Sequence, residues 1–163
     1  MRSAQDKIIM REEAAAELAR LKRAGKRIVL ANGCFDTLHV GHVRYLSGAK
    51  REGDILVVAV NSDASTRGLK GPGRPILGEQ SRALLVAAQR DVDFVLLFSE
   101  PNVEALLEEL RPDVHAKGTD YGVDTVPERE VSRRLGIRVA IVGDPKDHST
   151  RSFLEAIRKG PHG

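Results

Sequence analysis

The sequence contains a single cysteine, Cys34, no tryptophan and only 4% aromatic residues. One cysteine excludes an internal disulfide and a thiolate-rich metal site. Because aromatic side chains are scarce, the core must be built from Val, Leu, Ile and Ala, which suits a parallel sheet buried on both faces. At 163 residues the chain is long enough for a substantial core. We expect one domain over residues 1–163, with 1–26 as a helical extension packed on it.

Long apolar runs and runs of basic residues are also missing. No stretch approaches the length of a membrane span, and the N-terminus lacks the apolar segment of a secretory signal. We therefore expect a cytoplasmic protein without membrane contact. The 26 Lys and Arg are balanced by 23 Asp and Glu, and no basic run lies among stacking aromatics. This balance argues against nucleic acid as a partner and suits a nucleotide-sized polyanion equally well.

Short aliphatic runs alternate with helical patterns along the chain. The runs predict strands at 27–31, 55–60, 94–98, 113–116 and 138–142. The periodic segments predict helices at 11–24, 41–51, 79–90, 103–110, 127–135 and 150–159. The alternation predicts an α/β fold, a doubly wound five-stranded parallel sheet of Rossmann-like type in order 3-2-1-4-5, with helices on both faces. Ligands bind such sheets at the carboxyl ends of the strands, where the strand order reverses.

Residues 31–42, Ala-Asn-Gly-Cys-Phe-Asp-Thr-Leu-His-Val-Gly-His, are the most informative segment. They stand where a predicted strand passes into a helix, and N–H groups at such a junction form an anion site. His39 and His42 flank Gly41, where a side chain would block the close approach of a phosphate. A zinc pair is the alternative, but zinc needs further ligands and none follows on the same helix. We predict that both histidines act on a phosphate.

Cationic and polar residues lie at other predicted strand ends and loops. Lys70 and Arg74 belong to a Gly/Pro-rich stretch that we interpret as a mobile active-site loop over 68–78, able to close over a triphosphate. A solvated turn with two stray cations is the alternative. Arg82 stands one turn into the next helix, where it would form an ion pair or contact a phosphate.

Two further segments have simpler interpretations as well. Asp36 suits a local cap that accepts backbone N–H groups, and Cys34 and Phe35 suit core positions at the strand end. Ser149 and Thr150 precede the last predicted helix, where hydroxyl residues are normally N-caps. A helix N-terminus with two hydroxyls would also bind a β- or γ-phosphate, and the following Arg151 adds charge there.

Together these motifs resemble the cytidylyltransferase-like nucleotidyltransferases, with their GxFDxxHxGH opening and a late Ser-Thr segment. The resemblance covers residues 7–158 and continues through these matches: Asn61-Ser62-Asp63, Leu69-Lys70-Gly71, Arg74-Pro75, Arg82, Val92-Asp93 and Lys117-Gly118-Thr119-Asp120-Tyr121. The Asn-Gly-Cys-Phe-Asp opening and the Lys-Gly-x-Asp-Tyr loop favour the adenylyltransferases that activate D-glycero-β-D-manno-heptose 1-phosphate. One motif departs from that group, because Arg151 stands where a second Thr is usual.

The resemblance implies that a sugar phosphate attacks the α-phosphorus of ATP and releases pyrophosphate, a step toward ADP-heptose and the lipopolysaccharide core. It implies catalytic roles for His39, His42 and Lys70. It implies nucleotide contacts by Gly33, Cys34, Phe35, Asp36, Gly41, Arg82, Lys117, Gly118, Asp120, Ser149, Thr150 and Arg151. It implies acceptor contacts by Asn61, Asp63, Arg74 and Tyr121. Mg²⁺ is expected on the phosphates, without a direct set of protein ligands, and the expected assembly is a homodimer.

Three other functions fit parts of the pattern. A CTP-dependent glycerol-3-phosphate or phosphoethanolamine transferase would keep the chemistry and change the substrates. A nucleotide sensor without catalysis is disfavoured because both histidines, Lys70 and Arg82 are retained. The His-x-Gly-His segment also resembles the signature of class I aminoacyl-tRNA synthetases, but 163 residues leave no room for their tRNA-binding domains.

Overall fold

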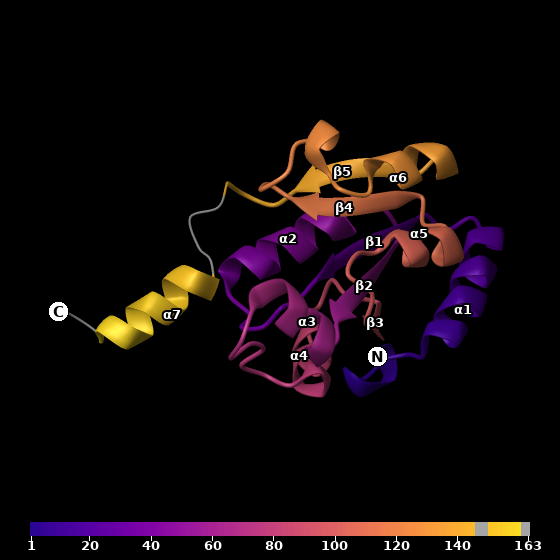
Figure 1. Ribbon diagram of the computed structural model, residues 1–163. Coiled ribbons are helices and arrows are strands. Elements are labelled where there is room, and N and C mark those ends of the chain that lie inside the picture. Colours follow the sequence, from indigo (N-terminus) through magenta and orange to yellow (C-terminus); the bar gives the residue numbers. More distant parts are fainter. Residues whose placement is uncertain (146–149, 161–163) are drawn as a thin grey trace.

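The computed structural model describes residues 1–145 and 150–160. Its centre is a single parallel sheet in the order β3-β2-β1-β4-β5 (Figure 1). The strands are β1 (Ile28–Gly33), β2 (Ile55–Asn61), β3 (Phe94–Phe98), β4 (Val114–Gly118) and β5 (Arg138–Val142). The predicted fold class and strand order are therefore confirmed. The strands are aliphatic runs because helices cover both of their faces.

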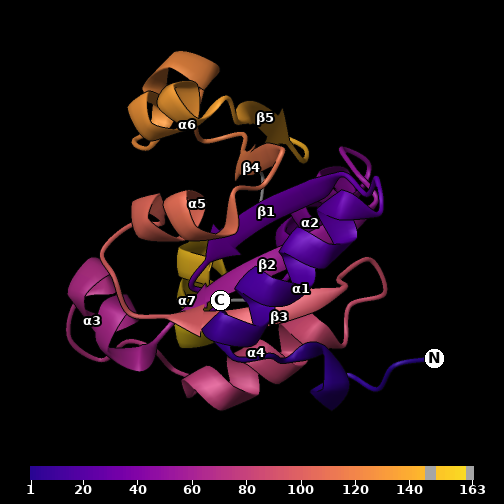
Figure 2. The same ribbon diagram turned by 90° about the vertical axis from the view of Figure 1, so that its right-hand side faces the viewer.

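Helices pack on both faces of this sheet (Figure 1 and Figure 2). They are α1 (Arg11–Arg23), α2 (Val40–Lys50), α3 (Asp63–Lys70), α4 (Glu79–Ala87), α5 (Glu104–Leu110) and α6 (Arg129–Leu135). The chain also contains α7 (Thr150–Lys159) and two short 3-10 turns, η1 (Gln5–Lys7) and η2 (Val123–Thr125). The apolar side chains of α2 and α4 form one core layer with the sheet, and those of α1 and α5 form the other. In the described part of the chain, no helix is long and apolar enough to cross a membrane.

The N-terminal residues pack against the rest of the chain. Ile8 pairs with Val95 of β3 in an isolated parallel bridge, and the Ile9 N–H donates to the Val95 carbonyl at 2.9 Å. Ala14 and Leu18 of α1 are buried in the core layer that α1 shares with α5. Figure 1 shows α7 differently placed, apart from the sheet and beyond the edge at which the arrowheads of β4 and β5 end.

Helix α3 corrects the prediction of a loop that begins at residue 68. Ser62 caps this helix by accepting the Ser65 N–H at 3.2 Å, and the Thr66 hydroxyl donates to the Asn61 carbonyl. Ser, Thr and Gly within its eight residues have weak helix propensity, so contacts with the rest of the fold stabilise it. Lys70 is consequently the last residue of a helix, and the loop begins at Gly71, which has a positive φ of 94°.

Strands β1 and β4 separate toward their carboxyl ends. All of β1 from Ile28 to Gly33 pairs with β2, whereas only Val29, Leu30 and Ala31 pair with β4. The strand order reverses at this point, so the separation opens a crevice where ligands of doubly wound sheets bind. The segment that follows β1 contains the two histidines.

Candidate active site

A cavity of about 190 Å³ lies at the carboxyl end of β1. It is lined by Asn32, Gly33, Cys34, Phe35, Asp36, His42, Tyr45, Lys70 and Arg74. Residues from the segment after β1, the end of α3 and the loop after α3 thus meet at one place, as expected for loops at the carboxyl edge of a parallel sheet. The cavity is smaller than the roughly 300–1,000 Å³ of sites that enclose a whole drug-sized ligand, and its cationic side chains suit the phosphate part of one.

The two histidines stack on each other at the start of α2, with 3.9 Å between the ring centroids. His39 is the N-cap, and its Nδ1 accepts the Gly41 N–H at 3.1 Å. Nδ1 of His42 accepts the His39 N–H at 3.4 Å. An Nδ1 that accepts carries no hydrogen, so each neutral ring has its hydrogen on Nε2. The backbone of the helix start therefore sets the same tautomer in both rings, with the hydrogen on Nε2 of each.

Phe35 explains the glycine at position 33. Its backbone is left-handed, with φ of 48°, and its buried ring lies 5.2 Å from the His42 ring between centroids. A Cβ added to Gly33 would lie 3.1 Å from the Phe35 ring. In this structure Gly33 makes room for the phenyl ring, and the core position predicted for Phe35 is confirmed. Cys34 is partly exposed and lines the cavity, so its predicted core position is wrong.

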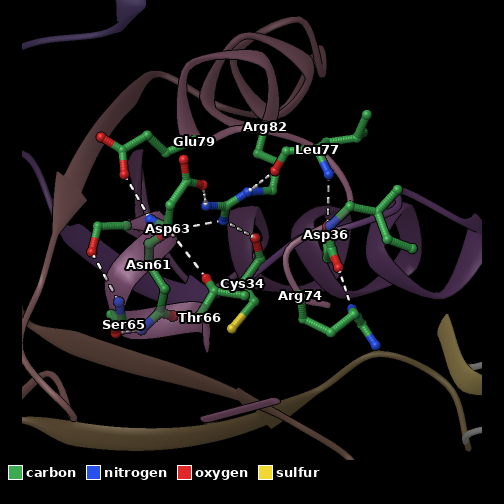
Figure 3. Close-up of polar contacts among 12 residues, drawn as sticks. Cys34, Asp36, Asn61, Asp63, Ser65, Thr66, Arg74, Leu77, Glu79 and Arg82 are labelled. Atoms are coloured by element: carbon green, nitrogen blue, oxygen red, sulfur yellow. Dashed lines mark hydrogen bonds and ion pairs between the residues drawn. The ribbon is translucent and has the colours of Figure 1, made fainter. Parts of the chain in front are cut away.

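Asp36 accepts backbone N–H groups, as predicted, but not locally (Figure 3). Its Oδ1 accepts from Ile76 at 2.7 Å and Leu77 at 3.1 Å, 40 and 41 positions later, and Oδ2 accepts from Nε of Arg74. Burial by itself raises the pKa of this carboxyl, but the Arg74 guanidinium and the two N–H groups outweigh it and hold the pKa below its ordinary value. Asp36 therefore anchors the loop that carries Arg74.

Arg82 forms an ion pair with Asp63, which was one of its two predicted roles. Its side chain is fully buried, and Figure 3 shows the guanidinium directed at Cys34 and Asp63. Nε donates to the Leu77 carbonyl at 2.8 Å, Nη1 to the carbonyls of Cys34 and Asn61, and Nη2 to Oδ1 of Asp63 at 2.9 Å. All of these partners are internal, and the predicted nucleotide contact of Arg82 stays a prediction. Arg82 holds the cavity-lining segments together from inside.

Asn61 and Asp63, predicted to contact the acceptor, also have internal partners (Figure 3). The Asn61 amide donates to the Ser65 hydroxyl at 2.8 Å. The Asp63 carboxylate accepts a hydrogen bond from Arg82, and the backbone N–H of Asp63 donates to the Glu79 carboxylate at 2.6 Å. Both residues therefore stabilise the start of α3 and its link to α4. Neither lines the cavity described above.

The end of β4 and the loop that follows it do not line the cavity. Lys117 is only 7% exposed, with Nζ 3.7 Å from the Glu128 carboxylate and 4.7 Å from the centroid of the Tyr121 ring. Its charge is thus used inside the protein. Gly118 ends β4, and Asp120 is exposed on the loop that follows.

The late motif lies apart from the cavity or outside the described residues. Ser149 falls outside the described residues, and for Thr150 only its place at the start of α7 is described. Arg151 is exposed on α7, which Figure 1 places apart from the sheet. The predicted phosphate contacts of these three residues stay predictions.

Two residues that line the cavity, Asn32 and Tyr45, were not among the predicted site residues. Asn32 and Tyr45 join β1 to β4 beside the cavity, and Asn32 is bonded to the fully buried His115. The sequence offered one indication of this, a polar residue, His115, between the apolar Val114 and Ala116 of a predicted strand. Its partner lies 83 positions away, a distance over which sequence periodicity carries no information.

Comparison with known proteins places this geometry in a family. The family model described as "Cytidylyltransferase-like" matches residues 30–154. The chain belongs to the cytidylyltransferase-like family. The predicted resemblance is therefore confirmed, and this membership supports the predicted nucleotidyltransferase class. The match begins within β1, includes the histidine pair and ends in α7.

Curated members of the cytidylyltransferase-like family with high similarity are named "Bifunctional protein HldE". The protein from Syntrophotalea carbinolica is 45% identical over 151 residues, which cover 93% of this chain and 31% of that protein. The one from Geotalea uraniireducens is 50% identical over 139 residues, covering 85% of this chain and 28% of that protein. The chain thus spans about a third of the length of these relatives.

Two solved structures share the fold. One is titled a lipopolysaccharide core biosynthesis protein from Thermoplasma volcanium, with TM-score 0.64, 30% identity, and coverage of 75% of this chain and all of the other. The other, a pantoate-beta-alanine ligase from Francisella tularensis, has TM-score 0.64 and covers 88% of this chain and 69% of the other. At 16% identity the second supports the fold alone.

Proposed function

We propose that this chain transfers a nucleoside monophosphate from a nucleoside triphosphate, ATP, to a sugar phosphate, D-glycero-β-D-manno-heptose 1-phosphate, and releases pyrophosphate. The observation that carries the proposal is the stacked histidine pair at the start of α2, of which His42 lines the cavity together with Lys70 and Arg74. Similarity to the HldE proteins over most of this chain supports it. A place in ADP-heptose and lipopolysaccharide synthesis, and a homodimer, belong to the same proposal.

The proposed step needs positioning and positive charge rather than a base. A phosphate monoester is largely dianionic near neutral pH, since its second pKa is about 6. One of its oxygens attacks the α-phosphorus, and the bond from that phosphorus to the bridging oxygen breaks, so pyrophosphate leaves with the electron pair. In the transition state, negative charge develops on the oxygens of the transferred phosphoryl group and of the leaving pyrophosphate. Hydrogen-bond donors that are already fixed in place stabilise this charge.

The residues around the cavity supply such donors. In this proposal, the Nε2–H groups of His39 and His42 bind the α-phosphate oxygens, because the backbone of α2 has already set their tautomers. Lys70 and Arg74 neutralise the remaining phosphates. Asp36 holds Nε of Arg74, and Figure 3 shows the Nη end of that guanidinium pointing away from the carboxylate.

We propose that Mg²⁺ enters with the triphosphate as part of the substrate. Among the described residues, no group of three or more His, Cys, Asp or Glu side chains could hold a metal ion. The cavity's carboxylate, Asp36, already accepts from Arg74 and two backbone N–H groups. This donor set does not suit a resident metal, so the protein's part is to bind the phosphates that carry the ion.

A substrate panel tests the proposed function. Purified protein is incubated with Mg²⁺, with ATP, CTP or GTP, and with heptose 1-phosphate, glycerol 3-phosphate or phosphoethanolamine, while pyrophosphate is measured. We expect release with ATP and the heptose 1-phosphate. If pyrophosphate is released only with CTP and one of the other acceptors, the proposed substrates are wrong but the proposed reaction type is right. If the protein binds ATP tightly but releases no pyrophosphate with any of the acceptors, it is a nucleotide sensor instead.

A further inference from the structure

Two side chains bridge β1 and β4 at the crevice where their pairing ends. The Tyr45 hydroxyl accepts the Asn32 N–H at 3.3 Å and donates to the Ala116 carbonyl at 2.8 Å. Nε2 of His115 lies 3.0 Å from Oδ1 of Asn32. Val114 and Ala116 belong to the core layer under α2 and α4, so His115 between them faces the opposite side of the sheet. The crevice is thus bridged on both sides, and Asn32 takes part in both bridges.

The bond to His115 determines how the Asn32 amide is turned. An amide carbonyl oxygen only accepts, so Nε2 of His115 must carry the hydrogen. His115 is fully buried, and burial together with the charge of Lys117 lowers its pKa to about 3, so the ring is neutral at physiological pH. With Oδ1 held by His115, the two N–H donors of Nδ2 point to the other side of the amide. Asn32 lines the cavity.

The charges around the cavity indicate which part of a ligand Asn32 meets. Lys70 and Arg74 reach the cavity from α3 and the loop after it, on the β2 side of β1. Asn32 stands on the β4 side, where its nearest partners, His115 and Tyr45, are uncharged and the charge of Lys117 is paired with the Glu128 carboxylate. Phosphates therefore suit the first side, and the uncharged oxygen and nitrogen acceptors of a nucleoside suit the second.

We propose that the Asn32 side-chain amide donates a hydrogen bond to the nucleoside of the bound nucleotide, and that His115 is the positioning residue that turns the amide toward it. The inference rests on the proposed function, whose nucleotide it places. It adds a specificity contact on the β4 side of the crevice. Substitution of either residue then weakens nucleotide binding through the same bond.

Four variants test the proposal: Asn32→Ala, His115→Leu, His115→Gln and the double variant Asn32→Ala/His115→Leu. The KM of each substrate is measured separately, and the Kd of ATP is measured by calorimetry without acceptor. We expect Asn32→Ala to raise the KM and Kd of ATP about tenfold, the effect of one hydrogen bond, with the KM of the acceptor unchanged. His115→Leu should act in the same direction. His115→Gln keeps an N–H donor for Oδ1 and should stay near wild type.

The double variant separates positioning from general damage. If His115 acts through Asn32, the double variant binds ATP no more weakly than Asn32→Ala. Additive losses, or a normal Kd for ATP in Asn32→Ala, would overturn the proposal, as would a raised KM confined to the acceptor. Should His115→Leu fail to fold, Asn32→Ala and His115→Gln still decide the question.

Nucleotide analogues locate the contact. If the gap between wild type and Asn32→Ala disappears with 2′-deoxy-ATP or 3′-deoxy-ATP, the missing hydroxyl is the acceptor; if it persists with both, the base is. The proposed function and this inference fail separately. Wild type that binds ATP but releases no pyrophosphate contradicts the function, while the Kd comparison still tests Asn32. Wild type that binds no nucleotide contradicts both.

Discussion

Acid should destabilise this protein through His115 well above the pH at which carboxylates titrate. The pKa of His115 falls from the model-peptide value of 6.5 to about 3 in the fold, first because the ring is buried and second because Lys117 is near. The folded state therefore excludes a proton that the unfolded chain binds. The contribution of neutral His115 to the free energy of unfolding is therefore complete above pH 6.5, and it is lost as the pH falls toward 3.

The size of the effect follows from the shift. Each pH unit between the two pKa values changes the free energy of unfolding by about 1.4 kcal/mol per group. Lowering the pH from 6.5 to 4.5 should therefore cost about 2 kcal/mol from His115 alone, because the imidazole of the unfolded chain is already half protonated at pH 6.5. That is a large part of the roughly 5–15 kcal/mol by which domains are stable.

Urea unfolding at a series of pH values measures this loss, with His115→Gln as the matched control. Glutamine does not titrate, so its curve lacks the His115 contribution. The carboxyl groups with lowered pKa values are common to both proteins and cancel in the difference; they are Asp6, Glu17, Asp36, Asp91 and Glu100. We expect the difference in free energy of unfolding between wild type and variant to change by about 2 kcal/mol over these two pH units. Parallel curves would refute the reasoning, because they would mean that His115 is protonated equally in both states.

Three further predictions concern the cavity. His42→Ala should lower turnover about a hundredfold or more, the effect of losing one oriented donor, while circular dichroism and the urea midpoint show a folded protein; near-normal turnover would remove His42 from the mechanism. Lys70→Ala should lower kcat/KM for ATP at least about tenfold, whereas Arg67→Ala, exposed on the same helix and not lining the cavity, should not; equal effects would point to general surface charge. Arg82→Met should lower the free energy of unfolding by about 3–5 kcal/mol, because it leaves Asp63 and three carbonyls without their partner; a variant as stable as wild type would contradict the anchoring role.

The sheet was predictable because its signal is local. Each strand is an aliphatic run between helical segments, and this alternation implies parallel strands and right-handed crossovers. The same rule placed the segment after β1 at the ligand-binding edge, and with it His39 and His42. Helix α3 was missed because Ser, Thr and Gly make its propensity weak, and its cap and packing come from the surrounding fold.

The direction of each polar side chain depends on distant partners. A buried cation is held where several carbonyls converge, and Arg82 meets carbonyls that lie 5, 21 and 48 positions away. Asn61, Asp63 and Lys117 likewise use their polar groups inside the protein. Their spacing in the chain is the same whether they face a ligand or the interior.

Local pattern thus established the parallel sheet and the family to which the chain belongs. It also predicted where the histidine pair stands in the fold, because periodicity and a contiguous motif are properties of neighbouring residues. Tertiary structure alone decided which polar residues line the cavity and which support it from behind. Asp36 with Ile76, Arg82 with Cys34, and His115 with Asn32 are pairs that only the folded chain brings within hydrogen-bond distance. A buried polar group must find its partner wherever the fold supplies one.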